Sequence, residues 1–278
     1  MALEIEVEIE QKSIKKVFAS GGNFSYLVNF PVIEQGLDYI LGHFNVGSSD
    51  LWPRTISTKT TQGRQLIVYS REEALARFKQ ANLLDCRISA YPSRKYYKRH
   101  LAPNFLFIDL DSQSLDWNKE LEQTLSNMKR LLENDSVEPT VLLSGKGYHI
   151  YLPTDALVLE DATNIFEDIE IYDPSRRFMQ WSEQYLTDGK ADPCHSKGVS
   201  FNNCMLRVPG SINSKNCNQV KIIQRCNGVR PSIKPLLYDF YIYLADIKLK
   251  EAQGVREERS VTDRAAARKM YGYWRRGH

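Results

Sequence analysis

Residues 105–111 read FLFIDLD, an apolar run in which the only polar residues are Asp109 and Asp111 at its end. A short apolar run of this kind predicts a buried β-strand. Because the side chains of a strand alternate between its two faces, both carboxylates project from the same side. Two carboxylates about 6 Å apart repel each other by roughly 3 kcal/mol at an effective dielectric constant of about 20. The sequence therefore predicts a cation at the end of this strand, the alternative being that both acids simply face water.

Mg²⁺ and Mn²⁺ fit such a pair, because both ions prefer oxygen ligands. A third carboxylate would complete the ligand set. Asp192, which stands directly ahead of Pro193, is the best candidate for it. Asp188 and Asp173 are the alternatives in the same region.

The segments that follow 105–111 predict the rest of a sheet. Apolar residues recur at helical spacing over 117–132, and short apolar strands are expected at 141–143 and 148–152. Residues 144–147 form a tight turn between these two strands. A strand, a crossover helix and then a hairpin fit half of a ferredoxin-like or RRM-like sheet.

Further elements are predicted on either side of this centre. A capping box at Ser70–Glu73 indicates that a helix starts there. The same periodicities predict strands at 3–10, 205–208 and 220–223, mixed and mainly helical structure at 157–186, and helices at 239–249 and 262–273.

The turn of the predicted hairpin, Ser144–His149 (SGKGYH), places a hydroxyl, an ammonium and an imidazole group within one short segment. Its glycines allow backbone N–H groups to approach phosphate oxygens. The glycine spacing of a P-loop is absent. Ser144, Lys146 and His149 are therefore candidate phosphate ligands, the alternative being a plain hairpin turn with an exposed lysine.

A second donor-rich segment is Leu206–Lys215 (LRVPGSINSK). Arg207 stands within an apolar strand, where its guanidinium group requires an anionic partner. Ser211, Asn213 and Lys215 follow as further donors, and arginine together with lysine suits a triphosphate. The alternative is a surface turn in which Arg207 pairs with a nearby carboxylate.

The composition is that of an ordinary globular protein: 278 residues, 42% apolar, 26% charged and a net charge of +3. No stretch approaches the roughly 18 apolar residues of a membrane span, and the first residues do not resemble a signal peptide. We therefore expect a cytoplasmic protein without a membrane partner.

The distribution of charge indicates a nucleic-acid partner more clearly than the net charge does. A basic run with interleaved tyrosines comprises Arg94, Lys95, Tyr96, Tyr97, Lys98 and Arg99. Such a run attracts phosphates, and its aromatic rings can stack on bases. A basic tail at 251–278 has the same character. The alternative for either segment is a solvated surface.

Five cysteines are present, an odd number without any CxxC pair, so free thiols are expected. Four residues could nevertheless converge on a single zinc ion: Cys194, His195, Cys204 and Cys217.

Taken in order, three of these segments resemble the motifs of archaeo-eukaryotic primases. They are Asp109-Leu110-Asp111, then Ser144–His149, then Asp192 followed by Arg207–Lys215. The similarity is greatest to the primase-polymerases of archaea, their plasmids and viruses. It covers roughly residues 90–225.

The resemblance implies an α+β fold in which an N-terminal α/β module packs on an RRM-like (ferredoxin-like) catalytic module. The active site would lie in the cleft between the two modules. The modules are expected at about 1–100 and about 101–235 of a catalytic core at 1–250, followed by a basic C-terminal helix or linker at 251–278.

The resemblance also implies the roles of the site residues. Two Mg²⁺ or Mn²⁺ ions would be held by the catalytic acids Asp109, Asp111 and Asp192. The phosphates of a nucleoside triphosphate would be bound by Ser144, Lys146, His149, Arg207, Ser211, Asn213 and Lys215. The other partners would be a single-stranded DNA template, a primer, and a helicase or another replication protein.

Three other classes of protein are alternatives to this interpretation. A replication initiator of the rolling-circle type needs a His-x-His pair, and the strand at 148–152 contains only His149. A non-catalytic single-strand-binding module would explain the basic run but not the acids that end an apolar strand. A metal-dependent nuclease is the third alternative.

Overall fold

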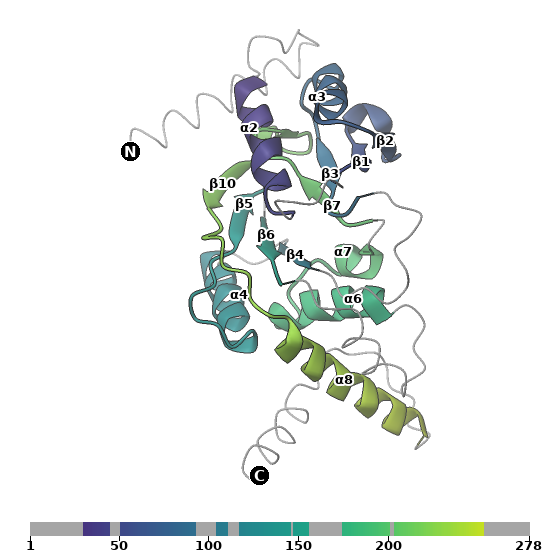
Figure 1. Cartoon of the computed structure of the whole chain (residues 1–278), viewed down its shortest axis with the longest axis vertical. Helices are drawn as coiled ribbons and strands as arrows, with labels where there is room; N and C mark the ends of the chain where they lie inside the picture. Colours follow the sequence, from purple (N-terminus) through teal and green to yellow (C-terminus); the bar gives the residue numbers. More distant parts are fainter. Residues whose placement is uncertain are drawn as a thin grey trace. The chain divides into compact units, whose positions relative to one another are not determined.

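The computed structural model describes residues 30–44, 51–92, 104–110, 117–145, 147–155, 174–200 and 203–252 (Figure 1). The chain divides into two compact units, each assembled from separate stretches. The first unit comprises Met1–Lys95, Thr140–His149 and Phe201–Arg225; the second comprises Tyr96–Pro139, Ile150–Ser200 and Cys226–His278. Helices and antiparallel sheets occur together, which confirms the predicted α+β class.

The first unit consists mainly of short strands. Its helical elements are α2 (Phe30–Leu41), the 3₁₀ helix η2 (Lys59–Thr61) and α3 (Arg71–Gln80). Its strands are β1 (Arg54–Ser57), β2 (Leu66–Val68), β3 (Arg87–Ser89), β5 (Thr140–Leu143), β7 (Met205–Arg207), β8 (Ile212–Asn213), β9 (Asn218–Gln219) and β10 (Lys221–Gln224).

Four of these strands form an antiparallel sheet of order β2-β1-β3-β7. One face of the sheet belongs to the core, because its apolar side chains are fully buried: Ile56, Val68, Ile88 and Leu206. Burying one such side chain contributes about 1.5–3 kcal/mol. Side chains alternate along a strand, so Arg87 and Arg207 lie on the other face of the sheet.

Helix α2 packs closely on the turn that follows β7. A Cβ atom added to Gly36 would lie 2.1 Å from the carbonyl oxygen of Pro209, and one added to Gly210 would lie 2.9 Å from the backbone of Ile33. Gly210 also has φ +86°, a conformation that favours glycine. The Pro-Gly pair of the donor-rich segment is therefore required for packing.

Helix α3 begins at the predicted capping box. The Ser70 hydroxyl accepts the backbone N–H of Glu73 at 3.2 Å, and the Glu73 carboxylate accepts the N–H of Tyr69 at 2.9 Å. The first bond satisfies a donor that the start of a helix leaves without a partner, and the second ties the residue before the cap to the first turn.

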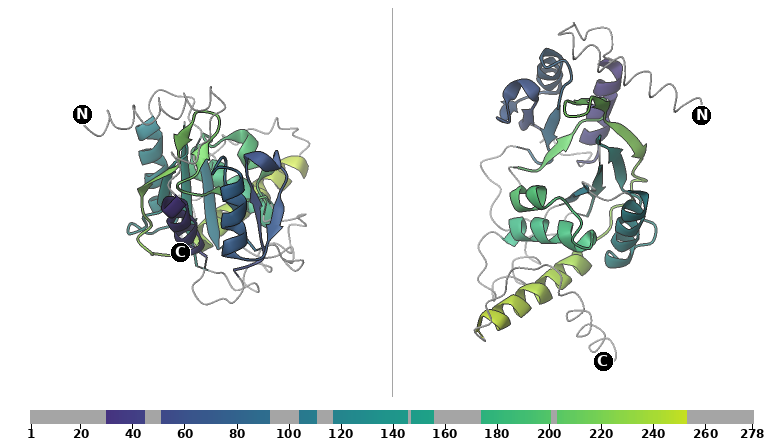
Figure 2. Two further views of the ribbon diagram at one scale, coloured as in Figure 1. Left: turned by 90° about the horizontal axis from the view of Figure 1, so that it is seen from above. Right: turned by 180° about the vertical axis from the view of Figure 1, so that it is seen from behind.

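The second unit contains most of the helices. Its elements are β4 (Phe105–Leu110), α4 (Trp117–Leu131), α6 (Pro174–Leu186), α7 (Pro193–Gly198) and α8 (Lys234–Ala252), with the greater part of β6 (Tyr148–Pro153). Figure 2 shows α6 alongside α8. Their contact is aromatic, because the rings of Phe178, Trp181 and Phe240 pack against one another with centroids 5.3–6.2 Å apart.

The second sheet has the strand order β10-β5-β6-β4. Helix α4 therefore connects β4 to a strand that is not its neighbour, since β6 lies between β4 and β5. Among the described residues, β4 has no strand on its other side.

The predicted elements agree with the observed ones to within one or two residues at 105–111, 117–132, 141–143, 148–152, 205–208 and 220–223. The helix predicted at 239–249 is longer and begins at Lys234. Of the segment 157–186, only α6 is described, and the elements predicted at 3–10 and 262–273 lie outside the described residues. None of the described helices has the length and apolarity needed to cross a membrane.

Candidate functional site

Asp109 is held by two hydrogen bonds on the edge of β4 that has no described neighbouring strand. Its backbone N–H donates to the Oε1 atom of Glu183 in α6 at 2.8 Å. Its carbonyl oxygen accepts the backbone N–H of Asp192 at 2.9 Å. Two of the three acids predicted to hold metal ions, which are far apart in sequence, are thus joined by one backbone hydrogen bond.

Asp192 is the N-cap residue of α7. Its Oδ1 atom accepts the N–H of Cys194 at 2.8 Å, which orients the carboxylate at the start of the helix. Its carbonyl oxygen accepts both the N–H and the hydroxyl of Ser196, each at 3.0 Å. Gln184 in turn donates to the Ser196 hydroxyl at 2.6 Å, so the backbone of Asp192 is fixed to α6 as well as to β4.

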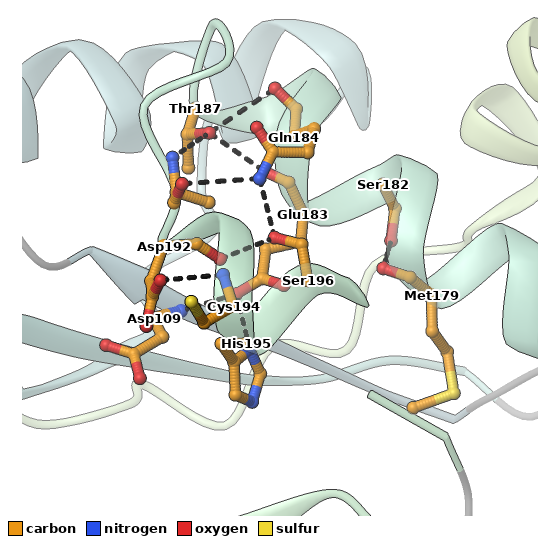
Figure 3. Close-up of polar contacts among 11 residues, drawn as sticks. Asp109, Met179, Ser182, Glu183, Gln184, Thr187, Asp192, Cys194, His195 and Ser196 are labelled. Carbon is orange, nitrogen blue, oxygen red and sulfur yellow. Dashed lines mark hydrogen bonds and ion pairs between the residues drawn. The ribbon is translucent and has the colours of Figure 1, made fainter. Parts of the chain in front are cut away.

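A buried glutamate–histidine pair lies beside these two acids (Figure 3). Glu183 Oε1 and His195 Nδ1 are 2.8 Å apart, and the Glu183 side chain is only 1% exposed. The His195 ring packs edge-on against Phe107, with centroids 4.4 Å apart. Among the described residues, Glu183 Oε2 and His195 Nε2 are buried without a hydrogen-bond partner.

Burial and pairing act in opposite directions on this pair. Burial raises the pKa of Glu183, and the hydrogen bond from His195 only partly offsets that rise. Burial acts to lower the pKa of His195, but the hydrogen bond to Glu183 and the negative charges of Glu183, Asp109 and Asp192 raise it overall. Sequence reasoning missed Glu183, since nothing in the helical segment around it marks a functional residue.

The third predicted acid, Asp111, lies outside the described residues. Of the two alternatives to Asp192, Asp173 also lies outside them, and Asp188 accepts a hydrogen bond from Asn127 at 2.9 Å. Within the described ranges, no group of three His, Cys, Asp or Glu side chains is placed to hold a metal ion. The metal assignment to Asp109, Asp111 and Asp192 therefore stays a prediction.

The four candidate zinc ligands differ in their surroundings. Cys194 is exposed and His195 is paired with Glu183 in the second unit. Cys204 is fully buried and Cys217 half-buried, and both belong to the first unit. Zinc binding by these residues gains no support from the described part of the chain.

The predicted hairpin turn is stabilised by its own backbone. Ser144 donates its N–H to the carbonyl of Gly147 at 3.0 Å, and its buried hydroxyl donates to the same oxygen at 3.2 Å. Gly145 has φ +130°, and a Cβ atom there would lie 2.4 Å from the Asn216 amide nitrogen and 2.7 Å from that of Asn213. Only glycine fits this position. Lys146, which stands between Gly145 and Gly147 in the sequence, is outside the described residues.

This turn and the donor-rich segment are brought together within the first unit. The Asn213 side-chain amide donates to the carbonyl of Ser144 at 2.7 Å, and that of Asn218 donates to the carbonyl of Gly145 at 3.4 Å. The second and third predicted motifs therefore meet, and Asn213 serves to join them. His149, on β6, is buried at 6% exposure.

Arg207 pairs with a carboxylate, as the alternative interpretation of its segment predicted. Its guanidinium group lies 3.3 Å from the carboxylate of Asp85, a residue 122 positions away. The same carboxylate accepts the N–H of Ser214 at 3.0 Å and its hydroxyl. Burial alone would raise the pKa of Asp85, but the hydrogen bonds from Ser214 and the charge of Arg207 lower it overall.

The remaining candidates of this segment differ in exposure. Ser211 is fully buried, and its hydroxyl has no hydrogen-bond partner among the described residues. Lys215 is exposed, and its N–H donates to the Asn213 side chain at 3.1 Å. The basic run Arg94–Arg99 lies outside the described residues.

No protein-family model and no curated protein matches the sequence. Several solved structures are similar, including the following two. The first is primase RepB′, with 16% sequence identity and a TM-score of 0.44, over 88% of this chain and 69% of that one. The second is the AEP domain of the cyanophage S-2L primase-polymerase, with 12% identity and a TM-score of 0.46, over 73% of this chain and 96% of that one.

Proposed function

We propose that this protein is a DNA primase-polymerase. It transfers nucleotides from nucleoside triphosphates onto a primer or an initiating nucleotide, directed by a single-stranded DNA template. The observation that carries the proposal is the 2.9 Å hydrogen bond between the N–H of Asp192 and the carbonyl of Asp109. It brings the first and third acidic motifs to one place.

The fold of the catalytic module supports the proposal. The strand order β5-β6-β4, with α4 connecting β4 to β5, is that of a split β-α-β unit, as in ferredoxin-like and RRM-like domains. In the proposed arrangement this module carries Asp109 and Asp192, and the active site is the cleft that it forms with the N-terminal module.

The donor set suits two divalent metal ions. Asp109 and Asp192 supply carboxylate oxygens that are both partly accessible to solvent, and Asp111 follows Asp109 at strand spacing. Oxygen ligands of this kind select Mg²⁺ or Mn²⁺ over softer metals. Asp109, Asp111 and Asp192 would hold the two ions, which would supply activation of the primer 3′-hydroxyl and charge stabilisation for the leaving pyrophosphate.

The protein's own residues position the nucleotide. His149, Arg207 and Lys215 are the proposed donors to the triphosphate, and Lys146 is a further candidate from the sequence. Asp85 holds the Arg207 guanidinium group and the Ser214 turn, and Asn213 holds the hairpin turn, so the Arg207 guanidinium group and both turns are fixed before the nucleotide binds. Phosphoryl transfer depends chiefly on such positioning and on charge stabilisation.

The direct test is incubation of the protein with single-stranded DNA, labelled nucleoside triphosphates and Mg²⁺ or Mn²⁺, with and without a primer. We expect template-dependent incorporation that EDTA abolishes. Binding of single-stranded DNA without any incorporation would favour a non-catalytic binding module, and degradation of the strand would favour a nuclease.

A further inference from the structure

Glu183 links the two elements that carry Asp109 and Asp192. It accepts the N–H of Asp109 in β4, and through His195 it is bonded to α7, whose N-cap is Asp192. Both donors converge on one carboxylate oxygen, Oε1, at 2.8 Å each. A shift of either element would therefore break a hydrogen bond to a buried carboxylate.

The histidine of this pair is itself held in place by the same strand. The ring of Phe107 contacts that of His195 edge-on, and Phe107 lies two residues before Asp109 in β4. Strand β4 thus contacts the pair twice, once through a side chain and once through the backbone of Asp109. The imidazole can adopt few other orientations while these contacts persist.

Burying a carboxylate between two elements costs free energy, because the carboxylate loses its contact with water. Replacing a buried ion pair by apolar side chains of similar volume is often neutral or stabilising, so burial of Glu183 is not explained by stability. Such a pair can instead fix the geometry of the residues around it. Here the pair fixes the backbones of Asp109 and Asp192.

We propose that Glu183, oriented by His195, is a positioning residue that sets the placement of the Asp109 carboxylate relative to that of Asp192. The inference rests on the proposed function, in which these carboxylates hold divalent metal ions. The groups that hold a metal ligand in place commonly change metal affinity about 10- to 100-fold when they are removed.

The test is the affinity for Mn²⁺, titrated into the whole chain and followed by the electron paramagnetic resonance signal of the free ion. Glu183→Leu and His195→Phe should each weaken Mn²⁺ binding about tenfold or more. Glu183→Gln should remain within about threefold of the wild type, because its side-chain oxygen still accepts the N–H of Asp109. Should Glu183→Leu fail to fold, His195→Phe, which keeps the ring against Phe107, is the deciding variant.

Asn127→Ala is the matched control for a loss of stability alone. Asn127 is a buried polar residue of the same unit, bonded to the carbonyl of Leu186 and to Asp188 but not to β4. It should lower the free energy of unfolding and leave Mn²⁺ affinity unchanged. Wild-type Mn²⁺ affinity in folded Glu183→Leu and His195→Phe would overturn the positioning role alone, whereas a wild-type chain that binds no Mn²⁺ would overturn the proposed function with it.

Discussion

Arg87 and Arg207 lie directly opposite each other in the antiparallel pairing of β3 with β7. Cross-strand residues have Cβ atoms about 4.5–5.5 Å apart, and like charges placed so are destabilising. Asp85 contributes one carboxylate to Arg207, at 3.3 Å. In the proposed function, the triphosphate is a second anion for Arg207 besides Asp85.

Replacement of Arg207 by alanine should weaken binding of nucleoside triphosphate about 10- to 100-fold, since a charge-assisted hydrogen bond contributes about 1.5–3 kcal/mol. Affinity for single-stranded DNA should stay close to that of the wild type. Fluorescence titrations with a labelled triphosphate and with a labelled oligonucleotide measure the two affinities separately. Arg64→Ala, which removes an exposed arginine of the same unit, is the control. The opposite pattern, with reduced DNA affinity and intact nucleotide affinity, would assign Arg207 to the template.

Asp85 should make stability depend on pH in the acid range. Its pKa is lowered in the folded protein, so its contribution is present above the unfolded value of about 3.9 and is lost as the pH falls through the lower folded value. Urea denaturation of the wild type and of Asp85→Asn at pH 7 and pH 3 measures this contribution to the free energy of unfolding. We expect the wild type to be more stable by about 1–2 kcal/mol at pH 7, with a smaller difference at pH 3. An equal difference at both pH values would exclude this linkage.

Asp109→Asn should reduce nucleotide incorporation to the level of a reaction without enzyme, because it removes a proposed metal ligand. The fold should persist, since the backbone hydrogen bonds of Asp109 do not involve its carboxylate. Thermal unfolding and primer extension should be measured on the same preparation. Extension at the wild-type rate by the folded variant would refute the metal assignment, and Asp135→Asn, which removes an exposed acid of the same unit, serves as the control.

Gly145→Ala should destabilise the protein by about 1–3 kcal/mol, the range for a residue held in a sparsely populated backbone conformation. The added Cβ atom would also collide with the amides of Asn213 and Asn216. Gly63→Ala is the matched control, because Gly63 has φ +82° but open space around it. A loss of unfolding free energy no greater than that of the control would show that the asparagines move aside without cost.

The basic run Arg94–Arg99 is the proposed binding segment for the template. Neutralising Arg94, Lys95, Lys98 and Arg99 together should weaken binding of single-stranded DNA and flatten its salt dependence, by about 0.7 in the logarithmic slope for each phosphate that is no longer neutralised. Nucleotide affinity should be retained. If deletion of residues 255–278 removes DNA affinity and the four substitutions do not, the basic tail is the template-binding segment.

The local elements of the fold were predictable because each depends on a short sequence period. The apolar run at 105–110, the helix over 117–131 and the cap at Ser70 were all identified to within one or two residues. The start of α8 at Lys234 was not, although Pro235 in its first turn is a signal for the beginning of a helix.

The partners of the candidate site could be predicted only in part. The meeting of Asp109 with Asp192 was expected from the order of the motifs, whereas the contributions of Asp85 and Glu183 were not. Each contacts the site through tertiary packing over 74 residues or more, and no sequence period records such a contact. Buried carboxylates also look like ordinary surface acids in a sequence.

The hydrogen bonds at Asp109 have one further consequence, for association between molecules. A strand at the edge of a sheet presents unpaired N–H and C=O groups on which the strand of another chain can assemble. On the outer edge of β4 both groups of Asp109 are already occupied, by a side chain from α6 and by the backbone at the start of α7. The strand that bears the acid is thereby protected at this position against edge-to-edge aggregation with a second copy of the protein.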